Sequence, residues 1–328
     1  MKVKWGILGN ANIARNAMIP ALKKSTNAEL VGIASSRGTA KETATLYNIP
    51  KYFSSYQELL DDPEINAVYI PLPNNLHKEW VIKTAEAGKH ILCEKPAALT
   101  SDEVREMSDA CNSNNVLFME AFMYQFHPQH QKVKRLISEG VIGEVNLMRA
   151  HFSAFVDKAS GNFRLYREMG GGSVYDVGCY CIHAFRNILN SEPSEIFARS
   201  QPNADFDIDM TTTVSMLMDN GIQTVFDCSF EQPYREKYEV VGNKGTIEVL
   251  YPFRPDLHGT GIINVINGNG NKAEYRVDGN QYVLQVEHFS KCILSGQQPQ
   301  YTVENTINNM KVIDAVHRSL EENRQVKL

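Results

Sequence analysis

The first third of the chain alternates short apolar runs with amphipathic segments, and this alternation restricts the possible folds more than any other feature. Nearly continuous apolar strands connected by helices form a parallel sheet that is covered by helices on both faces. We therefore predict an α/β domain at the start of the chain. Its expected strands are Val3–Leu8, Glu29–Ser35, Tyr52-Phe53, Ala67–Leu72, His90–Glu94 and Val116–Ala121. A helix expected over Ile13–Lys24 contains Pro20, which must kink or split it.

The pattern changes after Ala121. A glycine-rich break, Gly170-Gly171-Gly172, leads into a helix expected over Ser173–Leu189. From Pro193 to Tyr275 the chain is a series of β segments joined by turn sequences, which is typical of a mostly antiparallel sheet. We therefore predict two domains, residues 1–121 and an α+β domain of residues 122–328. Helices are expected near Gln281–Leu294 and Val303–Glu321, at the end of the chain. The last helix could pack back on the first domain.

Composition and charge exclude several classes of protein. The chain has 328 residues, 43% apolar and 22% charged, with a net charge of −5 and no run rich in lysine or arginine. It therefore lacks the basic surface expected of a nucleic-acid-binding protein. The six cysteines include no C-x-x-C pair, which argues against a disulfide framework and a metal site. No apolar run approaches the ~20 residues of a membrane span and no signal peptide is visible, so we expect a soluble, cytoplasmic protein with no membrane partner.

The turn after the first expected strand has the position of a dinucleotide fingerprint. It reads Gly9-Asn10-Ala11-Asn12-Ile13-Ala14, with alanine at the second and third glycine positions. The second glycine normally lets the backbone approach the pyrophosphate, so Ala11 pushes the phosphates outward slightly. We predict that the backbone N–H groups of Gly9, Asn10, Ala11, Asn12 and Ile13 bind a diphosphate at a helix N-terminus. The alternative is an ordinary tight turn between a strand and a helix.

The end of the second strand favours NADP over NAD. An NAD site usually has an acidic residue there, which binds the ribose diol. This chain has Ser35-Ser36-Arg37 and no carboxylate before Glu42. Because a hydroxyl and a guanidinium suit a 2′-phosphate, we predict that Ser36 and Arg37 bind NADP, with NAD remaining possible. The alternative is a solvated loop arginine.

Lys95 ends a buried strand, within Glu94-Lys95-Pro96. A lysine there costs desolvation unless its charge is used, and ligands of open α/β sheets bind at the carboxyl ends of the strands. On the helix expected over Ser173–Leu189, spacings of four and three place Asp176, Tyr180 and His183 on one face. The alternatives are a surface lysine, an acid favoured by the helix dipole and a core tyrosine. We expect His183 to have only a packing or surface role.

These motifs together resemble the Gfo/Idh/MocA oxidoreductase family, and the similarity extends from end to end. The motifs that carry it are Trp5-Gly6-Ile7-Leu8-Gly9, Pro73-Asn74-Asn75-Leu76-His77, Glu94-Lys95-Pro96 and the run from Gly171 to Tyr180. The resemblance implies a Rossmann domain followed by an open-faced, mostly antiparallel β-sheet that serves substrate binding and oligomer contacts. With a tyrosine at position 180, the chain resembles the branch of the family that contains dimeric dihydrodiol dehydrogenase, D-xylose dehydrogenase and glucose–fructose oxidoreductase.

The resemblance also implies roles for individual residues. Tyr180 is expected to donate and accept the proton, Lys95 to be its electrostatic partner, and Asp176 to orient the substrate hydroxyl or Lys95. Glu94 and His77 are expected to line the nicotinamide–ribose region, with Leu72 and Asn74 as further cofactor contacts and Arg164 as a weaker substrate candidate. An ammonium about 4 Å from the phenol stabilises the phenolate by ~4 kcal/mol at an effective dielectric constant of 20. This value is an upper limit, because burial of the phenol opposes it. It is enough to bring the pKa of a tyrosine into the range of acid/base catalysis.

We therefore predict an oxidoreductase that transfers hydride between NADP(H) and a CH–OH or carbonyl group of a sugar, polyol or cyclic diol. The alternative is a non-catalytic, dinucleotide-sensing regulator of the same fold, which would need no proton donor. Segments such as Thr213–Met218 and Thr224–Cys228 have apolar residues on both faces, as in a sheet buried between subunits. A homodimer or homotetramer assembled through the second sheet is therefore expected.

Overall fold

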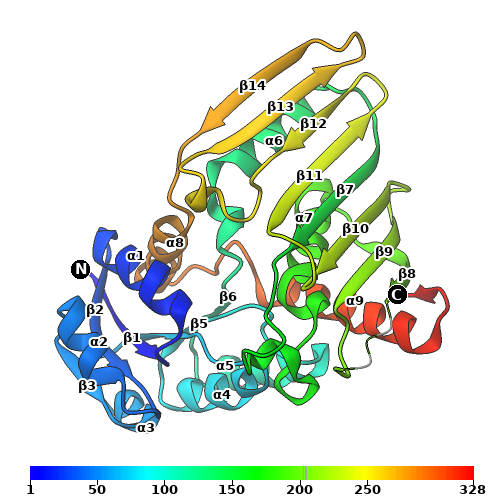
Figure 1. Cartoon of the computed structure of the whole chain (residues 1–328). Helices are drawn as coiled ribbons and strands as arrows, with labels where there is room; N and C mark the ends of the chain where they lie inside the picture. Colours follow the sequence, from blue (N-terminus) through cyan, green and yellow to red (C-terminus); the bar gives the residue numbers. More distant parts are fainter. Residues whose placement is uncertain (202, 204) are drawn as a thin grey trace. The chain divides into compact units, whose positions relative to one another are not determined.

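The computed structural model describes residues 1–201, 203 and 205–328 and divides into two compact units (Figure 1). The first unit contains residues 1–123 and 281–310, and the second contains residues 124–280 and 311–328. The sequence-based boundary at 121/122 lies two residues earlier along the chain. It also assigned residues 281–310 to the second domain, whereas the structure groups them with the first unit.

The first unit is built on a parallel sheet with strand order β3-β2-β1-β4-β5-β6 (Figure 1). The order reverses between β1 and β4, and such a switch point is where doubly wound sheets bind dinucleotides. The strands are β1 (Val3–Leu8), β2 (Ala28–Ala34), β3 (Lys51–Phe53), β4 (Ala67–Ile70), β5 (His90–Cys93) and β6 (Phe118–Glu120). The helices are α1 (Ile19–Lys24), α2 (Ala40–Tyr47), α3 (Tyr56–Leu60), α4 (His77–Glu86), α5 (Ser101–Ser113) and α8 (Gln281–Ser295).

The first helix is continuous from Asn12 to Lys24, so Pro20 does not split it. A π-helical turn, Ala14–Met18, directly precedes α1, and Pro20 is the second residue of α1. The backbone hydrogen-bond pattern therefore changes just before the proline, which has no N–H to donate. The chain therefore leaves the β1 turn through a widened helical turn of the kind often found at functional sites.

Helix α8 joins the first unit because it packs against β1 and α1. Trp5 on β1 is fully buried, and its indole N–H donates to the hydroxyl of Ser290 at 3.1 Å. A buried indole N–H needs such an acceptor, and the ring also packs on Phe289. Glu287 accepts hydrogen bonds from the backbone N–H and the hydroxyl of Thr26, each at 2.8 Å.

The second unit contains a nine-stranded sheet in the part of the chain that the structure describes, with order β14-β13-β12-β11-β7-β10-β9-β8-β15 (Figure 1). Strands β7 and β10 run parallel and the other neighbours run antiparallel, so the sheet is mostly antiparallel as predicted. The strands are β7 (Val145–Ser153), β8 (Pro193–Ser200), β9 (Thr211–Met218), β10 (Gln223–Ser229), β11 (Arg235–Gly242), β12 (Gly245–Val249), β13 (Gly261–Asn267), β14 (Lys272–Val277) and β15 (Val326–Lys327).

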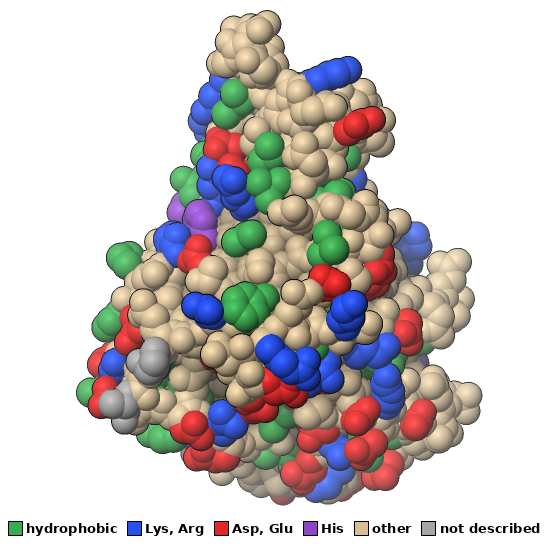
Figure 2. Space-filling view, turned by 90° about the vertical axis from the view of Figure 1, so that its right-hand side faces the viewer, with side chains coloured by type: hydrophobic (Ala, Val, Ile, Leu, Met, Phe, Trp, Pro, Cys, Tyr) green, Lys and Arg blue, Asp and Glu red, His purple; other side chains and the backbone are tan. Residues whose placement is uncertain are grey.

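One face of this sheet is covered by helices α6 (Pro128–Ser138) and α7 (Cys179–Leu189). On β9, Thr212, Val214 and Met216 are buried, whereas Thr213 and Ser215 alternate with them on the other face and are exposed. In Figure 2, which looks at the side where β9 and β10 lie, hydrophobic side chains are dispersed among basic and acidic ones. The other face of the sheet is therefore mixed in polarity.

The last helix, α9 (Val303–Glu322), contributes residues 303–310 to the first unit and residues 311–322 to the second. Among the described residues, no helix has the length and apolarity needed to cross a membrane. The cysteines are all buried, and none of those described forms a disulfide. No group of three or more His, Cys, Asp or Glu side chains in the described residues is arranged to hold a metal ion.

Candidate active site

The residues predicted to bind the dinucleotide follow the carboxyl ends of four neighbouring strands. The Gly9–Ile13 turn follows β1, Ser36 and Arg37 follow β2, Leu72–His77 follows β4, and Glu94 and Lys95 follow β5. Carboxyl ends of parallel strands lie at the same edge of a sheet, so the structure brings these segments to one edge, beside the switch point.

Gly9 adopts a backbone conformation that other residues rarely adopt, with φ of 129°. A Cβ at this position would also lie 2.9 Å from Cδ2 of Leu72, so any side chain here would displace the Leu72 side chain. The amide of Asn10 donates to the hydroxyls of Thr39 and Thr43, each at 2.8 Å. The Asn10 side chain thus fixes the turn to α2, while its neighbours Ala11 and Asn12 remain partly or fully exposed.

The end of β2 presents Ser36 and Arg37 to solvent. Ser35 is buried, and its hydroxyl lies 2.9 Å from the hydroxyl of Thr39 and accepts from the backbone N–H of Arg37 at 3.3 Å. The Arg37 guanidinium forms no ion pair with any residue that the structure describes. Its charge is therefore available for an anionic ligand.

Lys95 is half-buried in a turn held by hydrogen bonds on both sides. Before it, the hydroxyl of Tyr69 donates to Glu94 at 2.5 Å. After it, the backbone N–H of Ala97 donates to Glu120 Oε1 at 2.8 Å. Glu120 is fully buried and also accepts from the hydroxyl of Tyr301 at 3.3 Å. Sequence reasoning missed Glu120, although an acidic residue that ends an apolar strand was a visible signal.

His77 is fully buried and connects the loops after β4 and β5. Its Nδ1 lies 2.9 Å from the carbonyl oxygen of Pro96, and its Nε2 lies 2.8 Å from that of Leu72. Burial lowers the pKa of His77 to about 4, outweighing the two carbonyl groups, and the positive charge of Lys95 adds to the effect. The structure thus gives neutral His77 two backbone neighbours next to Lys95.

In the second unit, the triple glycine lets two backbone segments approach closely. A Cβ on Gly171 would lie 2.5 Å from the carbonyl oxygen of Arg164. The backbone N–H of Gly172 donates to that same oxygen at 3.0 Å. The approach brings Arg164 to Asp176, whose Oδ2 lies 2.7 Å from the arginine Nε. Arg164, the weaker sequence candidate, is therefore the ion-pair partner of a stronger one.

Asp176 lies in a second π-helical turn, Val174–Gly178, which continues into α7, so the α-helical spacing from which it was predicted to share a face with Tyr180 does not apply to it. The start of this turn is held by Asp209, whose Oδ2 accepts from the hydroxyl of Ser173 at 2.6 Å and from the backbone N–H of Val174 at 2.8 Å. Sequence reasoning missed Asp209 because nothing in its local sequence distinguishes it from other loop acids.

Tyr180, on α7, is only 6% exposed and lies among aromatic rings. Its ring centroid is 5.8 Å from that of Tyr124, 5.4 Å from that of Phe152 and 5.3 Å from that of Phe253. His183 is buried one turn further on, with Nδ1 2.5 Å from the hydroxyl of Tyr124. Burial holds the pKa of His183 well below its usual value, in keeping with the packing role expected for it.

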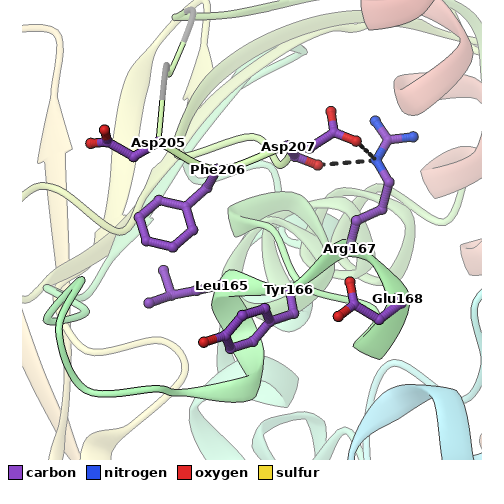
Figure 3. A pocket seen from close by; sticks show the side chains of 7 residues that line it. All are labelled: Leu165, Tyr166, Arg167, Glu168, Asp205, Phe206 and Asp207. Carbon is purple, nitrogen blue, oxygen red and sulfur yellow. Dashed lines mark hydrogen bonds and ion pairs between the residues drawn. The ribbon is translucent and has the colours of Figure 1, made fainter.

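A surface cavity of about 480 Å³ lies beside the Arg164 segment (Figure 3). An ion pair between Arg167 Nε and Asp207 Oδ2, 3.1 Å apart, crosses one side of it. Its lining residues are Leu165, Tyr166, Arg167, Glu168, Asp205, Phe206 and Asp207. The lining contains none of the predicted catalytic residues.

Comparison with known proteins identifies the family. Residues 3–122 match the model of an oxidoreductase family with an NAD-binding Rossmann fold, and residues 130–248 match the GFO/IDH/MocA C-terminal domain. An uncharacterised oxidoreductase from Rhizobium meliloti is 37% identical over 329 residues, covering 97% of both chains. The chain belongs to the Gfo/Idh/MocA oxidoreductase family. This confirms the prediction made from the sequence motifs, including the class of enzyme and its nicotinamide cofactor.

Several related proteins, some of known structure, match this Gfo/Idh/MocA oxidoreductase along nearly its whole length. An NADP(+)-dependent D-xylose 1-dehydrogenase from Haloferax volcanii is 33% identical, with 99% of each chain covered. The crystal structure of an aldose–aldose oxidoreductase from Caulobacter crescentus, complexed with glycerol, is 25% identical and has a TM-score of 0.92 over all of both chains. A 3-ketoreductase from Actinomadura kijaniata, in complex with NADP and TDP-benzene, is 27% identical with a TM-score of 0.92 over 98% of each chain.

Proposed function

We propose that this Gfo/Idh/MocA oxidoreductase transfers hydride between NADP(H) and a CH–OH or carbonyl group of a sugar, polyol or cyclic diol. The observation that supports the proposal is the location of two side chains, Lys95 and Tyr180. Lys95 lies at the carboxyl edge of the dinucleotide-binding sheet, and Tyr180 lies in an aromatic pocket on α7. The D-xylose dehydrogenase and the 3-ketoreductase described above are enzymes, which favours catalysis over a non-catalytic regulator.

The dinucleotide site fits the cofactor on its own geometry. The turn at Gly9 has a backbone that only glycine adopts readily, and it leads into a helical N-terminus whose N–H groups suit a diphosphate. Ser36 and the unpaired Arg37 charge suit a 2′-phosphate, and the named relative from Haloferax volcanii uses NADP(+). When bound, the cofactor supplies or accepts the hydride.

The remaining chemistry is proton transfer at the substrate oxygen, which we assign to Tyr180. Its phenol donates the proton when a carbonyl is reduced and accepts it when an alcohol is oxidised. Lys95 is proposed to act on the same oxygen, because its ammonium would stabilise both the phenolate and a developing alkoxide. Asp176 would accept hydrogen bonds from substrate hydroxyls while Arg164 holds its carboxylate in place.

The substrate class follows from this polar pair and from the relatives. A carboxylate beside a guanidinium offers an acceptor and donors to adjacent hydroxyls, which suits a neutral polyhydroxylated compound. D-xylose and the aldoses, on which two of the relatives described above act, have hydroxyl groups on adjacent carbons.

The experiment that tests the function is a panel of aldoses, polyols and cyclic diols, each assayed by absorbance of the reduced nicotinamide with NADP and with NAD. We expect turnover of at least one member, faster with NADP at subsaturating cofactor. A panel without turnover, on protein shown to bind NADP, would contradict the proposal.

We also propose a cytoplasmic homodimer or homotetramer. The buried free thiols favour a reducing compartment. Leu217 and Val225, 37% and 38% exposed, lie on the open face of the second sheet, on adjacent strands β9 and β10. Light scattering behind a sizing column should give the mass of two or four chains, and a mass near the 36.9 kDa of one chain would contradict the assembly.

A further inference from the structure

Glu236, on β11, is a buried carboxyl group that the proposed reaction does not use. It is 6% exposed and faces the interior of the second unit. Its Oε2 accepts hydrogen bonds from two consecutive backbone N–H groups, those of Phe253 at 2.7 Å and Arg254 at 2.9 Å. Its Oε1 accepts from the hydroxyl of Tyr234 at 2.9 Å.

Two of these three hydrogen bonds fix the segment at Phe253. A buried carboxyl group without partners would cost several kcal/mol, so the arrangement is stable only when both N–H groups reach Oε2. Two consecutive N–H groups directed at one oxygen fix the orientation of both peptide planes that flank Phe253, one before it and one after it. Glu236 therefore acts as a clamp on this turn.

The clamped residue forms one wall of the Tyr180 pocket. The Phe253 ring is fully buried and stacks on Phe152, with ring centroids 5.1 Å apart and planes 18° apart. It lies 5.3 Å from the ring of Tyr180 and 5.2 Å from that of Tyr124, measured between centroids. In a close-packed interior, a shift of the Phe253 backbone passes directly to the phenol that it contacts.

We propose that Glu236 is a positioning residue for Tyr180, which acts by fixing Phe253 through the backbone N–H groups of Phe253 and Arg254. The inference rests on the proposed role of Tyr180 and adds a residue to its support. The side chain's reach to two N–H groups is what matters, and its charge is not required.

The geometry explains why charge is dispensable. Burial raises the pKa of Glu236 to about 7, against the opposing effects of the hydrogen bonds from Tyr234, Phe253 and Arg254 and of the Arg254 charge. Asp256, which pairs with Arg254, is a further charged group near this turn. In the protonated form, Oε1–H donates to the Tyr234 oxygen while Oε2 still accepts both N–H groups. A glutamine can make the same contacts, with its amide in place of Oε1–H.

Two variants separate the reach of the side chain from its charge. Glu236→Gln keeps the reach and removes the charge, whereas Glu236→Asp keeps the charge and shortens the side chain by one methylene. We expect Glu236→Gln to keep kcat within about threefold of wild type and Glu236→Asp to lower kcat tenfold or more, with the KM for NADP unchanged in both. Glu239→Gln and Glu239→Asp are the matched controls. Glu239 lies on the same strand as Glu236 but forms an ion pair with Arg149 of the neighbouring strand β7.

The results have defined meanings. If both Glu236 variants keep wild-type kcat, or if the glutamine variant loses as much as the aspartate variant, the clamp does not position Tyr180. Hydrogen exchange in the absence of substrate provides an independent measurement: the amides of Phe253 and Arg254 should exchange slowly in wild type and in Glu236→Gln, and fast in Glu236→Asp. Fast exchange in wild type would overturn the clamp itself. Slow exchange with no turnover on the substrate panel would instead contradict the proposed function.

Discussion

The turn that carries Lys95 and the pocket that surrounds Tyr180 are held by different kinds of interaction. Backbone groups next to Lys95 meet buried polar side chains, with Ala97 N–H on Glu120 and the Pro96 carbonyl beside His77. Tyr180 is instead enclosed by the rings of Tyr124, Phe152 and Phe253. Polar groups hold the first residue directly, whereas in the second unit Glu236 acts one step removed, through Phe253.

This contrast predicts which amino-acid substitutions each region tolerates. A hydrogen-bonded turn loses a directional contact and leaves a buried donor unpaired when its acceptor is removed, which costs about 1–3 kcal/mol. An aromatic pocket is held by many weak contacts, so a change of similar volume usually costs less than about 1.5 kcal/mol. We therefore expect the Lys95 turn to be the more sensitive of the two.

The largest effect is expected from removing the two candidate catalytic groups. Lys95→Met and Tyr180→Phe should each lower kcat a hundredfold or more, because acid/base groups contribute ~10²–10⁴ to the rate. The affinity for NADP should stay within a few-fold, as measured by fluorescence titration. If the two residues act on one proton transfer, the double variant should be little slower than either single variant. Near-normal turnover in either single variant would remove that residue from the mechanism.

The two regions should also respond to pH in opposite directions. His77 has a folded pKa of about 4, below its ordinary 6.5, so the unfolded state binds more protons between these values and stability is lost as the pH falls from 6.5 through 4. Glu236 has a folded pKa of about 7, above its ordinary 4.5, so its contribution is fully present below pH 4.5 and is lost as the pH rises through 7. Each effect is on the order of 3 kcal/mol at full extent.

Urea unfolding of wild type, His77→Gln and Glu236→Gln across pH 4–8 measures both contributions as differences from wild type. The difference for His77→Gln should shrink toward low pH and that for Glu236→Gln should shrink toward high pH. Two differences with the same sign of slope would show that burial does not act on these groups as described.

A direct test of the contrast compares Glu120→Ala with Phe152→Leu. The first leaves the N–H of Ala97 buried without its acceptor and should lower the free energy of unfolding by about 2–3 kcal/mol and kcat by tenfold or more. The second removes aromatic contacts with Tyr180 and should cost about 1 kcal/mol, with a smaller loss of kcat. Equal losses from both substitutions would show that the two regions do not differ in sensitivity.

The smallest effect is expected at the cofactor's distal end. Arg37→Ala should weaken NADP binding about tenfold and NAD binding by less than about twofold, because only NADP has the 2′-phosphate. Calorimetric titration of both cofactors measures the ratio. Arg15→Ala provides the contrast: Arg15 bonds to the carbonyl of Asn10 in the diphosphate-binding turn, so its loss should weaken NADP and NAD to the same extent. Tighter binding of NAD than of NADP by the wild type would contradict the preference.

Local sequence was sufficient to predict the elements and the segments that carry the site. The periodicity of apolar residues predicted the parallel and antiparallel sheets, and Pro20 predicted an irregularity in the first helix, which the structure shows as a π-helical turn. Gly9 and Lys95 could be identified because their positions at strand ends are local properties. The two-residue strand β15 and the association of α8 with the first unit were missed, since two residues have no periodicity and a helix pattern does not name its partner.

The hydrogen-bond partners of the buried carboxyl groups could be known only from the tertiary structure. Glu120 meets Ala97 across 23 positions of the chain, Asp209 meets Ser173 across 36, and Glu236 meets Phe253 across 17. In each case the acid is stable in the interior because a backbone or hydroxyl donor from another segment satisfies it. Hydrophobic periodicity reports which face of an element is buried, so the local pattern was enough to predict the sheets and the edge that we propose binds the cofactor. It does not report which donors meet on that buried side, and that pairing, which holds Lys95 and Tyr180 in place, arises only when distant segments pack together.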